Sequence, residues 1–244
     1  MTHLADQTGQ AIFIKSGGFD VGGGCHAFST REGGVPHGGQ LEGSLARFLA
    51  AAGFPAGCTP VPLRQVHGNQ VHTIPPGAHR SQVPTADGAV TSRSDVILLL
   101  QTADCVPILL RDATSGVVGV IHAGWRGALA GVVARTLEAM ASLGASPSSI
   151  RAAIGPAIGP CCFEVGEEVA APFARLSPAL IEGQGPSWRL DLPGAVAHLL
   201  RRAGVPGEDT RTVAACTRCR TDLFFSHRGE KGLAGRLIAA ITLA

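Results

Sequence analysis

Short aliphatic runs separated by turn residues dominate the middle of the chain. Residues 96–100, 106–110 and 117–121 are almost continuously aliphatic, and segments rich in Asp, Ser, Thr and Gly lie between them. Runs of this length bounded by turn signals are typical of buried strands, because a core helix needs at least about ten residues. The pattern therefore predicts buried strands at these three positions.

A spacing of three to four residues between apolar positions predicts helices elsewhere. In residues 41–53, the positions Leu45, Phe48, Leu49 and Ala52 fall on one face, and Gly53 is placed to end the helix. Further helices are predicted at 128–142, at 167–176 and from Asp191 onward, and further strands within 61–74 and at 89–90, 150–154, 211–215 and 235–243, the last of which fits a helix equally well. With no internal repeat and no long linker, these elements predict a single α+β domain over residues 1–244.

The composition excludes several classes of protein. Hydrophobic residues make up 45% of the 244 residues and charged residues 16%, which rules out a disordered chain. The formal charge of +2, without a local Lys/Arg cluster, offers no surface for nucleic acid, and the absence of Tyr leaves few rings for base stacking. No apolar stretch approaches the ~20 residues of a membrane span, and the first ten residues lack a signal-peptide pattern. We therefore expect a soluble, cytoplasmic protein that binds neither nucleic acid nor a membrane.

The cysteines predict reduced thiols rather than a disulfide framework, because there are seven, an odd number, and no secretion signal. Cys216 and Cys219 form a CxxC motif, but it follows a strand-like segment and no second CxxC completes a zinc site. Cys161 and Cys162 are adjacent in a segment rich in Gly and Pro. Packing is the favoured interpretation for both pairs, and the role of the CxxC motif stays open.

Reactive side chains gather next to glycine in three segments, each at or just beyond the end of a predicted strand: 64–68, 102–107 and 122–127. Strand ends suit functional side chains, because the strand fixes the backbone while the loop leaves room for a ligand. His67, Cys105 and His122, one from each segment, form a His/Cys/His set that suits a four-coordinate zinc ion with one open position. The spacing matches no compact zinc motif, so two ordinary histidines and a buried cysteine also fit the pattern.

The segment 122–127, HAGWRG, also fits an anion site. A strand ends there, a glycine turn follows, and the next helix is predicted from Ala128. The start of that helix would offer free N–H groups and a partial positive charge at the turn that contains Gly124 and Gly127. Arg126 would add a planar guanidinium suited to phosphate. A tight corner with Arg126 in solvent or in an ion pair fits equally well.

Six stretches of the sequence resemble, in order, the motifs of the YfiH-like, laccase-domain family, whose members are described as purine nucleoside phosphorylases and earlier as polyphenol oxidases. They span nearly the whole chain: HAFSTREGGV (26–35), RQVHGNQV (64–71), TADCVPILL (102–110), HAGWRG (122–127), IGPAIGPCCFEVGEEV (154–169) and CT…DLFFSHR…GR between 216 and 236. Two departures stand out, a shortened segment near 36–45 and His227 where the family usually has an aromatic residue.

The resemblance implies both a fold and a metal site. The family fold is α+β, with mixed β-sheets flanked by helices and the active site in a cleft at strand ends. The family's metal ligands are the His of QVHG, the Cys of TADC and the His of HAGW, which correspond to His67, Cys105 and His122. We therefore expect Zn²⁺ at this site, with copper as the alternative metal, in a monomeric protein.

The resemblance also implies the reaction. It is the phosphorolysis of adenosine, inosine and methylthioadenosine to free base and ribose 1-phosphate, with adenosine deaminase activity on the side. Purine nucleosides and phosphate are then the expected partners. Arg31, Arg64 and Arg126 lie in matching motifs and are the candidates to bind phosphate, together with Gly124 and Gly127.

Asp104 is the candidate for general acid/base work or for orienting a ligand histidine, because it stands next to Cys105. A carboxylate that only shapes the turn is the alternative. With Cys105 and Arg126, Asp104 completes the expected catalytic set.

Three other activities compete with phosphorolysis. In a Cys-His hydrolase, Cys105 would be the nucleophile and His122 or His67 its base, and editing of peptidoglycan precursors has been linked to this family. A copper polyphenol oxidase needs several histidine clusters, and the 9 His and 2 Met of this chain include no His-x-His pair. A binding module without turnover is the third alternative.

Overall fold

The computed structural model describes residues 2–5, 11–20, 23–75, 77, 83–184 and 187–244. Its helices are α1 (Leu41–Ala52), α2 (Trp125–Leu129), α3 (Val132–Ser142), α4 (Glu167–Leu176) and α5 (Leu192–Arg202). Its strands are β1 (Thr2–Ala5), β2 (Ala11–Lys15), β3 (Cys25–Ser29), β4 (Thr59–Val61), β5 (Val71–Ile74), β6 (Gly88–Thr91), β7 (Val96–Thr102), β8 (Val106–Asp112), β9 (Val117–Ala123), β10 (Arg151–Ile154), β11 (Glu164–Val165), β12 (Ile181–Gln184), β13 (Ser187–Leu190), β14 (Thr210–Thr212) and β15 (Leu237–Thr242).

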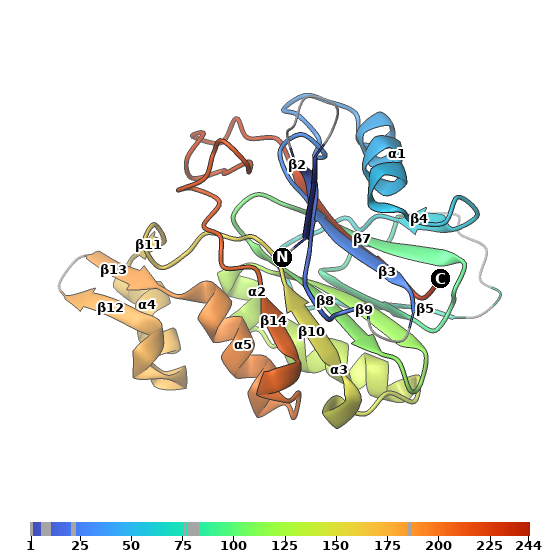
Figure 1. The fold of residues 1–244 in the computed structure, drawn as a ribbon. Helices are drawn as coiled ribbons and strands as arrows, with labels where there is room; N and C mark the ends of the chain where they lie inside the picture. The colour runs from blue at the N-terminus through green and yellow to red at the C-terminus, as the bar shows by residue number, and fades with distance from the viewer. Residues whose placement is uncertain (1, 6–10, 21–22, 76, 78–82, 185–186) are drawn as a thin grey trace.

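Two six-stranded sheets are stacked, and helices cover their outer faces, which gives four layers (Figure 1). The first sheet has the order β1-β2-β3-β15-β7-β4 and the second β14-β10-β8-β9-β6-β5. The pairs β4–β7, β5–β6 and β10–β14 are parallel, and the other pairs in these two sheets are antiparallel. Helix α1 lies on the first sheet and α2, α3 and α5 lie on the second, while α4 packs on the small sheet β11-β13-β12. The predicted α+β class with mixed sheets and flanking helices is confirmed.

The continuous aliphatic runs exist because the central strands are buried on both faces. In β7, Leu98 and Leu100 pack between the two sheets, whereas Ile97 and Leu99 pack under α1. A strand alternates its side chains between two faces, so a strand with two covered faces needs apolar residues at every position. The three predicted buried strands are β7, β8 and β9.

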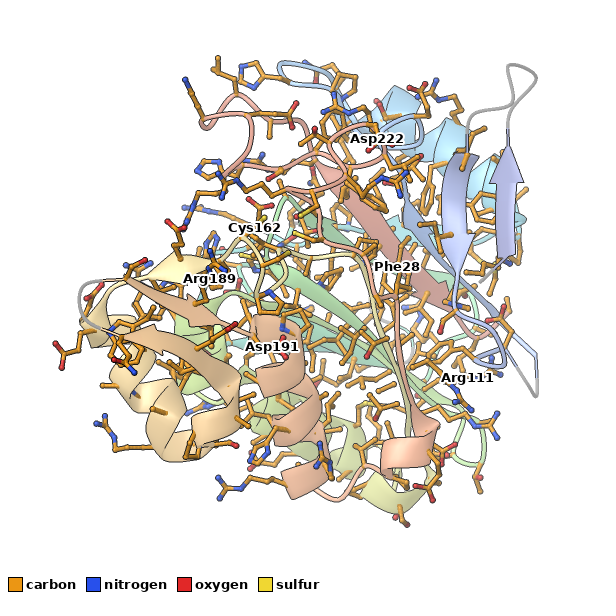
Figure 2. The ribbon with its side chains drawn as sticks, turned by 60° about the vertical axis from the view of Figure 1, so that its left-hand side comes forward. Phe28, Arg111, Cys162, Arg189, Asp191 and Asp222 are labelled. Atoms are coloured by element: carbon orange, nitrogen blue, oxygen red, sulfur yellow. The ribbon has the colours of Figure 1, made fainter. Side chains whose placement is uncertain are left out.

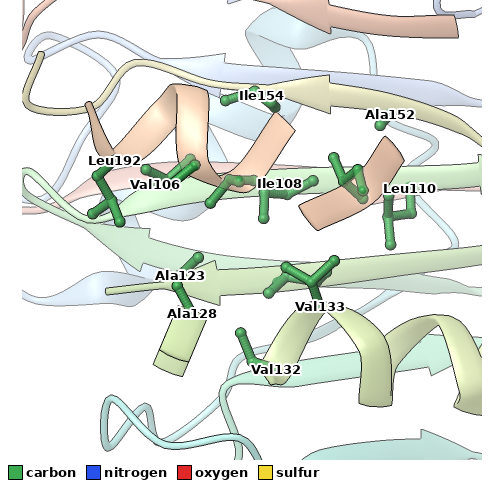
Figure 3. Packing of buried hydrophobic residues seen from close by; sticks show 14 of the residues in the cluster. Val106, Ile108, Leu110, Ala123, Ala128, Val132, Val133, Ala152, Ile154 and Leu192 are labelled. Carbon is green, nitrogen blue, oxygen red and sulfur yellow. The ribbon is translucent and has the colours of Figure 1, made fainter. Parts of the chain in front are cut away.

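The second sheet shows the same alternation on its helical side. Val106, Ile108 and Leu110 of β8 face the helices (Figure 3). Leu109 faces the first sheet. Burying a side chain of this kind is worth roughly 1.5–3 kcal/mol. The same alternation fixes the register of β8, because a shift by one residue would exchange its two faces.

The predicted helix at 128–142 proves to be two helices. Helix α2 begins at Trp125, before the start that the pattern predicted, and α3 begins at Val132. Gly131 separates them with a φ of 87°, a left-handed conformation that suits glycine and interrupts a helix. The correction matters for function, because it moves a helix start to the end of β9.

Residues 237–242 form a strand, β15, in the middle of the first sheet. It pairs with β3 on one side and with β7 on the other, and all of its residues are buried. Burial on both faces gives a continuous apolar run, which is why the periodicity could not separate strand from helix here. The β12–β13 hairpin was not predicted, because most of its residues are exposed and form no apolar run.

Candidate metal centre

The β8–β9 hairpin brings Cys105 and His122 to the same edge of the second sheet. In its register, Val106 pairs with Ala123 and Pro107 with His122. Cys105 directly precedes β8, so its side chain lies beside the end of β9. The register that buries the aliphatic faces of both strands therefore also places two chemically reactive side chains next to each other.

Asp87 connects the third residue, His67, to the same edge. The loop between β4 and β5 is held by backbone N–H groups of Val66, His67 and Gly68, which donate to the Asp87 carboxylate over 2.7–3.2 Å. These hydrogen bonds sustain the unusual φ of 60° at His67. Asp87 is fully buried, and its Oδ1 also accepts a hydrogen bond from Nδ1 of His122 over 2.8 Å. One carboxylate thus positions both histidines.

The three side chains form a group that can hold a metal ion. One ligand atom from each of His67, Cys105 and His122 lies within 4.8 Å of the other two. The two imidazole rings meet edge to face with their centroids 4.8 Å apart. Because Asp87 uses Nδ1 of His122, the Nε2 atom is left for a ligand role. His122 is buried and His67 is exposed, so the group opens toward solvent on one side.

At Cys105, His122 and Asp87, burial shifts the pKa in one direction and the hydrogen bonds within the group together shift it further in the other. Burial raises the pKa of the Cys105 thiol, but hydrogen bonds from His122 and His67 bring it down to about 7. Burial lowers the pKa of His122, but hydrogen bonds with Asp87 and Cys105 raise it to about 9. At Asp87 the hydrogen bonds from His122 and the Gly68 N–H overcome burial and lower the carboxyl pKa. Near neutral pH about half of Cys105 in the metal-free group is therefore thiolate, a ligand that a cation binds strongly.

Gly124 and Gly127 of the HAGWRG motif lie so close to neighbouring residues that a side chain at either position would be crowded. A Cβ on Gly124 would lie 3.1 Å from Cδ2 of His67 and 3.2 Å from the Cys105 sulfur. A Cβ on Gly127 would lie 2.7 Å from the carbonyl oxygen of Gly68. Gly124 is also the N-cap residue of α2. These contacts account for both glycines without an anion, so phosphate binding at this turn stays a prediction.

Asp104 makes contacts other than the histidine contact considered for it. Its Oδ1 accepts the hydroxyl hydrogen bond of Thr217 over 2.6 Å, and its Oδ2 accepts the backbone N–H of Arg228 over 2.7 Å. It adopts a φ of 88° in the turn before β8. Orientation of a ligand histidine belongs instead to Asp87, which sequence reasoning missed because Asp87 is twenty residues from His67 and stands out only as a turn residue before a strand.

Two pockets adjoin the group, and they share His67, Ala103, Cys105 and His227. The first is largely apolar and is also lined by Asp104, Trp125, Ile158, Phe163, Leu192 and Arg228. The second is more polar and is also lined by Leu63, Gln65, Gln101, Thr102, His122 and Arg236. An apolar hollow next to a polar one is a typical arrangement for a ligand with an apolar ring and a polar part.

The arginines predicted to bind phosphate lie outside these linings. In the described part of the chain, neither pocket is lined by Arg31, Arg64 or Arg126. Arg31 pairs with Glu230 over 2.7 Å. Arg64 is exposed, and the exposed Arg126 places its guanidinium 4.2 Å from the ring centre of Trp125. The motifs identified these arginines by sequence position alone, which does not determine where a long side chain ends.

The sequence and the fold are both similar to those of one protein family. The family described as multi-copper polyphenol oxidoreductase laccase matches residues 39–244. The chain belongs to this family. A purine nucleoside phosphorylase of Deinococcus radiodurans is 41% identical over 236 residues, which cover 89% of this chain and 88% of the relative. The purine nucleoside phosphorylase YlmD of Geobacillus stearothermophilus is 38% identical over 198 residues, which cover 72% and 69%.

A solved structure agrees with the sequence comparison. The crystal structure of the Bacillus licheniformis hypothetical protein YfiH has a TM-score of 0.81 and 30% identity to this chain, and the match covers 90% of this chain and 92% of that one. The predicted membership of the YfiH-like, laccase-domain family is confirmed. Within the described residues, no helix has the length and apolar character needed to cross a membrane.

Proposed function

We propose that the protein is a metal-dependent purine nucleoside phosphorylase. It cleaves inosine, adenosine and methylthioadenosine with phosphate, releases the free base and ribose 1-phosphate, and deaminates adenosine as a side activity. The observation that carries the proposal is the convergence of His67, Cys105 and His122 beside a two-part pocket, in a chain whose relatives carry the name purine nucleoside phosphorylase. Residues 1–244 act as one catalytic unit in this proposal.

The donor set suits Zn²⁺. Two imidazoles and one thiolate give three protein ligands, and the exposed side next to His67 leaves a fourth position free. A zinc ion held there would supply Lewis-acid chemistry toward phosphate or water. Asp87 fixes His122 in the tautomer whose Nε2 binds metal. Copper remains the alternative, because the same donors bind it.

The two pockets suit the two parts of a nucleoside. The purine base stacks in the apolar pocket against Phe163 and Trp125, and the ribose and phosphate occupy the polar pocket near Gln65 and Arg236. In the reaction, a phosphate oxygen attacks C1′, the C1′–N9 bond breaks, and the leaving base takes up a proton. Placing both reactants between the two pockets makes the attack effectively intramolecular.

The candidates for general acid/base catalysis are two side chains that line the pockets, Asp104 and His227. Asp104 lines the apolar pocket beside Cys105, and we assign it the acid/base role that its motif position predicts. His227 borders both pockets and is the second candidate to protonate the base. Asp104→Asn and His227→Phe separate the two, since only the variant of the true acid lowers kcat while leaving the phosphate KM unchanged.

The proposal is tested by release of hypoxanthine from inosine with and without phosphate. Phosphorolysis predicts that release depends on phosphate, that arsenate replaces it, and that ribose 1-phosphate forms in equal amount. Release that is equally fast without either anion makes the enzyme a hydrolase and overturns the proposal.

Two arginine variants test how phosphate is bound. Arg236 lines the polar pocket, and Arg126 is the arginine that the HAGWRG motif predicts. Loss of a charge-assisted contact costs roughly 1.5–3 kcal/mol, so the alanine variant of the phosphate ligand is expected to raise the phosphate KM at least about tenfold. If neither Arg236→Ala nor Arg126→Ala changes the phosphate dependence, both assignments fail.

One observation favours a second function, a Cys-His hydrolase. Cys105 has a pKa of about 7 and hydrogen bonds to two histidines, as a thiolate nucleophile would. The two functions differ in their need for metal. Full activity after removal of metal by a chelator supports the hydrolase, whereas loss of activity that zinc restores supports the phosphorylase.

A further inference from the structure

Four cysteines outside the site described above lie together in the fold. Their sulfur atoms, in Cys161, Cys162, Cys216 and Cys219, are all within 4.8 Å of one another. We propose that these four cysteines form a second metal site, which binds one Zn²⁺ ion through four thiolates and fastens two loops that build the pocket wall. The packing role expected from the sequence does not account for them, since Cys161 and Cys219 are exposed.

Tertiary contacts bring the two cysteine pairs together. Cys161 and Cys162 lie in the loop between β10 and β11, and Cys162 is labelled in Figure 2. Cys216 and Cys219 lie in the long segment between β14 and β15. A backbone bridge joins Ala157 to Cys216, and the N–H of Thr217 donates to the Ala157 carbonyl over 3.0 Å. These hydrogen bonds are independent of the sulfurs and hold the two loops at a fixed spacing.

The spacing of the sulfurs suits a single tetrahedral ion. The sulfur of Cys219 lies 3.5 Å from that of Cys161 and 3.4 Å from that of Cys162. A zinc–sulfur bond of about 2.3 Å in a tetrahedral site puts neighbouring sulfurs about 3.8 Å apart. All four cysteines are free thiols. Four soft sulfur donors around one point select Zn²⁺ over oxygen-preferring cations.

Backbone N–H groups also prepare the site for thiolates. The N–H of Gly159 donates to the Cys216 sulfur over 3.2 Å, and the N–H of Cys219 donates to it as well. N–H donors of this kind stabilise a negatively charged sulfur, which is the form that binds a cation.

The position of the site gives it a structural role in catalysis. The first loop carries Ile158 and Phe163, and the second carries His227 and Arg228, all of which line the apolar pocket. Thr217, between the two ligands of the CxxC motif, donates to Asp104 next to the metal ligand Cys105. An ion that fastens the loops would therefore hold one wall of the pocket and the Asp104 carboxylate in place.

Metal analysis of zinc-loaded, desalted protein tests the proposal. We expect two zinc ions per chain in the wild type and one in Cys219→Ser. Cys58→Ser is the matched control, because Cys58 is half-buried outside both groups and is expected to leave both ions bound. His122→Ala is expected to lose the other ion and keep this one. Equal zinc content in the wild type and Cys219→Ser, or no zinc in His122→Ala, overturns the proposal.

Cobalt identifies the donors of the second site. His122→Ala loaded with one equivalent of Co²⁺ is expected to show the intense sulfur-to-cobalt charge-transfer absorption of a tetrathiolate site. That absorption should be absent from the double variant His122→Ala, Cys219→Ser. Equal spectra for the two proteins overturn the assignment of the ligands.

Alkylation of the wild type gives a measurement that needs no variant. With zinc bound, iodoacetamide is expected to modify Cys58 and to spare Cys219 although Cys219 is exposed, and a chelator is expected to remove that protection. Peptide mass mapping measures each rate. Equal modification of Cys219 with and without zinc, or a disulfide to Cys219 in protein kept under reductant, overturns the proposal.

Discussion

The two sulfur-containing groups of this protein use similar ligands in different settings. His67, Cys105 and His122 stand at strand ends of the second sheet, where the β8–β9 register and the buried Asp87 fix them. The four cysteines stand in two loops that the Ala157–Cys216 backbone bridge brings together. A mixed set with an open side suits chemistry, whereas four thiolates around one ion suit a structural role. The two kinds of site therefore differ in their place in the fold as well as in their ligands.

Each group also contains a glycine against which its sulfur packs. A Cβ on Gly124 would lie 3.2 Å from the Cys105 sulfur, and a Cβ on Gly159 would lie 3.4 Å from the Cys161 sulfur. An added methyl group at Gly124 would therefore be slightly closer to its neighbours than one at Gly159. The electrostatics differ in the same sense, because imidazole neighbours lower the pKa of Cys105 while sulfur neighbours help to raise that of Cys161.

Removal of a ligand gives the largest expected difference between the groups. Cys105→Ala is expected to lose its metal ion and to lower kcat by at least about a thousandfold, since the metal supplies several kcal/mol of transition-state stabilisation. Cys219→Ser is expected to cause a far smaller loss, because it touches no reacting atom. Phosphorolysis rates and metal content of both variants measure this, with Cys58→Ser as control. Equal losses of kcat in the two variants would show that the two groups do not differ in their contribution to catalysis.

Asp87→Asn tests whether the buried carboxylate is needed for metal binding at the His-Cys-His group. It removes the charge that orients His122 and is expected to weaken metal binding about 10–100-fold. Because the pKa of Asp87 is lowered in the fold, its stabilising effect is present above the ordinary carboxyl pKa and is lost as the pH falls. The variant should therefore lose part of the acid dependence of unfolding.

Metal titration and unfolding at several pH values check the Asp87 variant. The control is Asp95→Asn, which removes a carboxylate that pairs with Arg93 at the surface. Unchanged metal affinity in Asp87→Asn would show that the three ligands are held without this carboxylate.

The rates at which the thiols are modified test the difference in pKa between Cys105 and Cys161. In metal-free protein, iodoacetamide is expected to modify Cys105 about threefold faster at pH 7 than an ordinary thiol, because about half of it is thiolate and lower nucleophilicity offsets part of the gain. Cys161 is expected to react more slowly although it is more exposed, because its pKa is about 12. Peptide mapping over a pH series gives both rates. An order set by exposure alone would contradict the prediction.

The paired glycines give the smallest expected effect. Gly124→Ala is expected to weaken metal binding at the His-Cys-His group about fivefold, equivalent to about 1 kcal/mol of overpacking. Gly159→Ala should weaken the four-cysteine site less, because its nearest contacts are longer. Gly43→Ala is the control, since its added methyl group meets nothing within 4 Å in α1. Calorimetric metal titration of the three variants ranks them, and a reversed order would contradict the packing argument.

The strands that carry the site, and the segments that meet there, can be predicted from the amino-acid sequence alone. The aliphatic runs became β7, β8 and β9, and the helix predicted at 41–53 ends as expected at Gly53, whose φ is 79°. These features are readable because strand and helix periods are set by neighbours within a few residues. The motif order added the family and the convergence of three ligand residues.

The side chains that complete each group are brought there by tertiary contacts, which the sequence pattern does not predict. Asp87 contacts His67 and His122 through a loop and a strand end, and the CxxC motif meets Cys161 and Cys162 across more than fifty residues of chain. The same holds for residues 237–242, whose strand conformation depends on pairing with β3 and β7. The physical reason is common to all of these cases: register and loop closure join residues that are far apart in sequence, and no local pattern of hydrophobic and polar positions records which distant partner a side chain will meet.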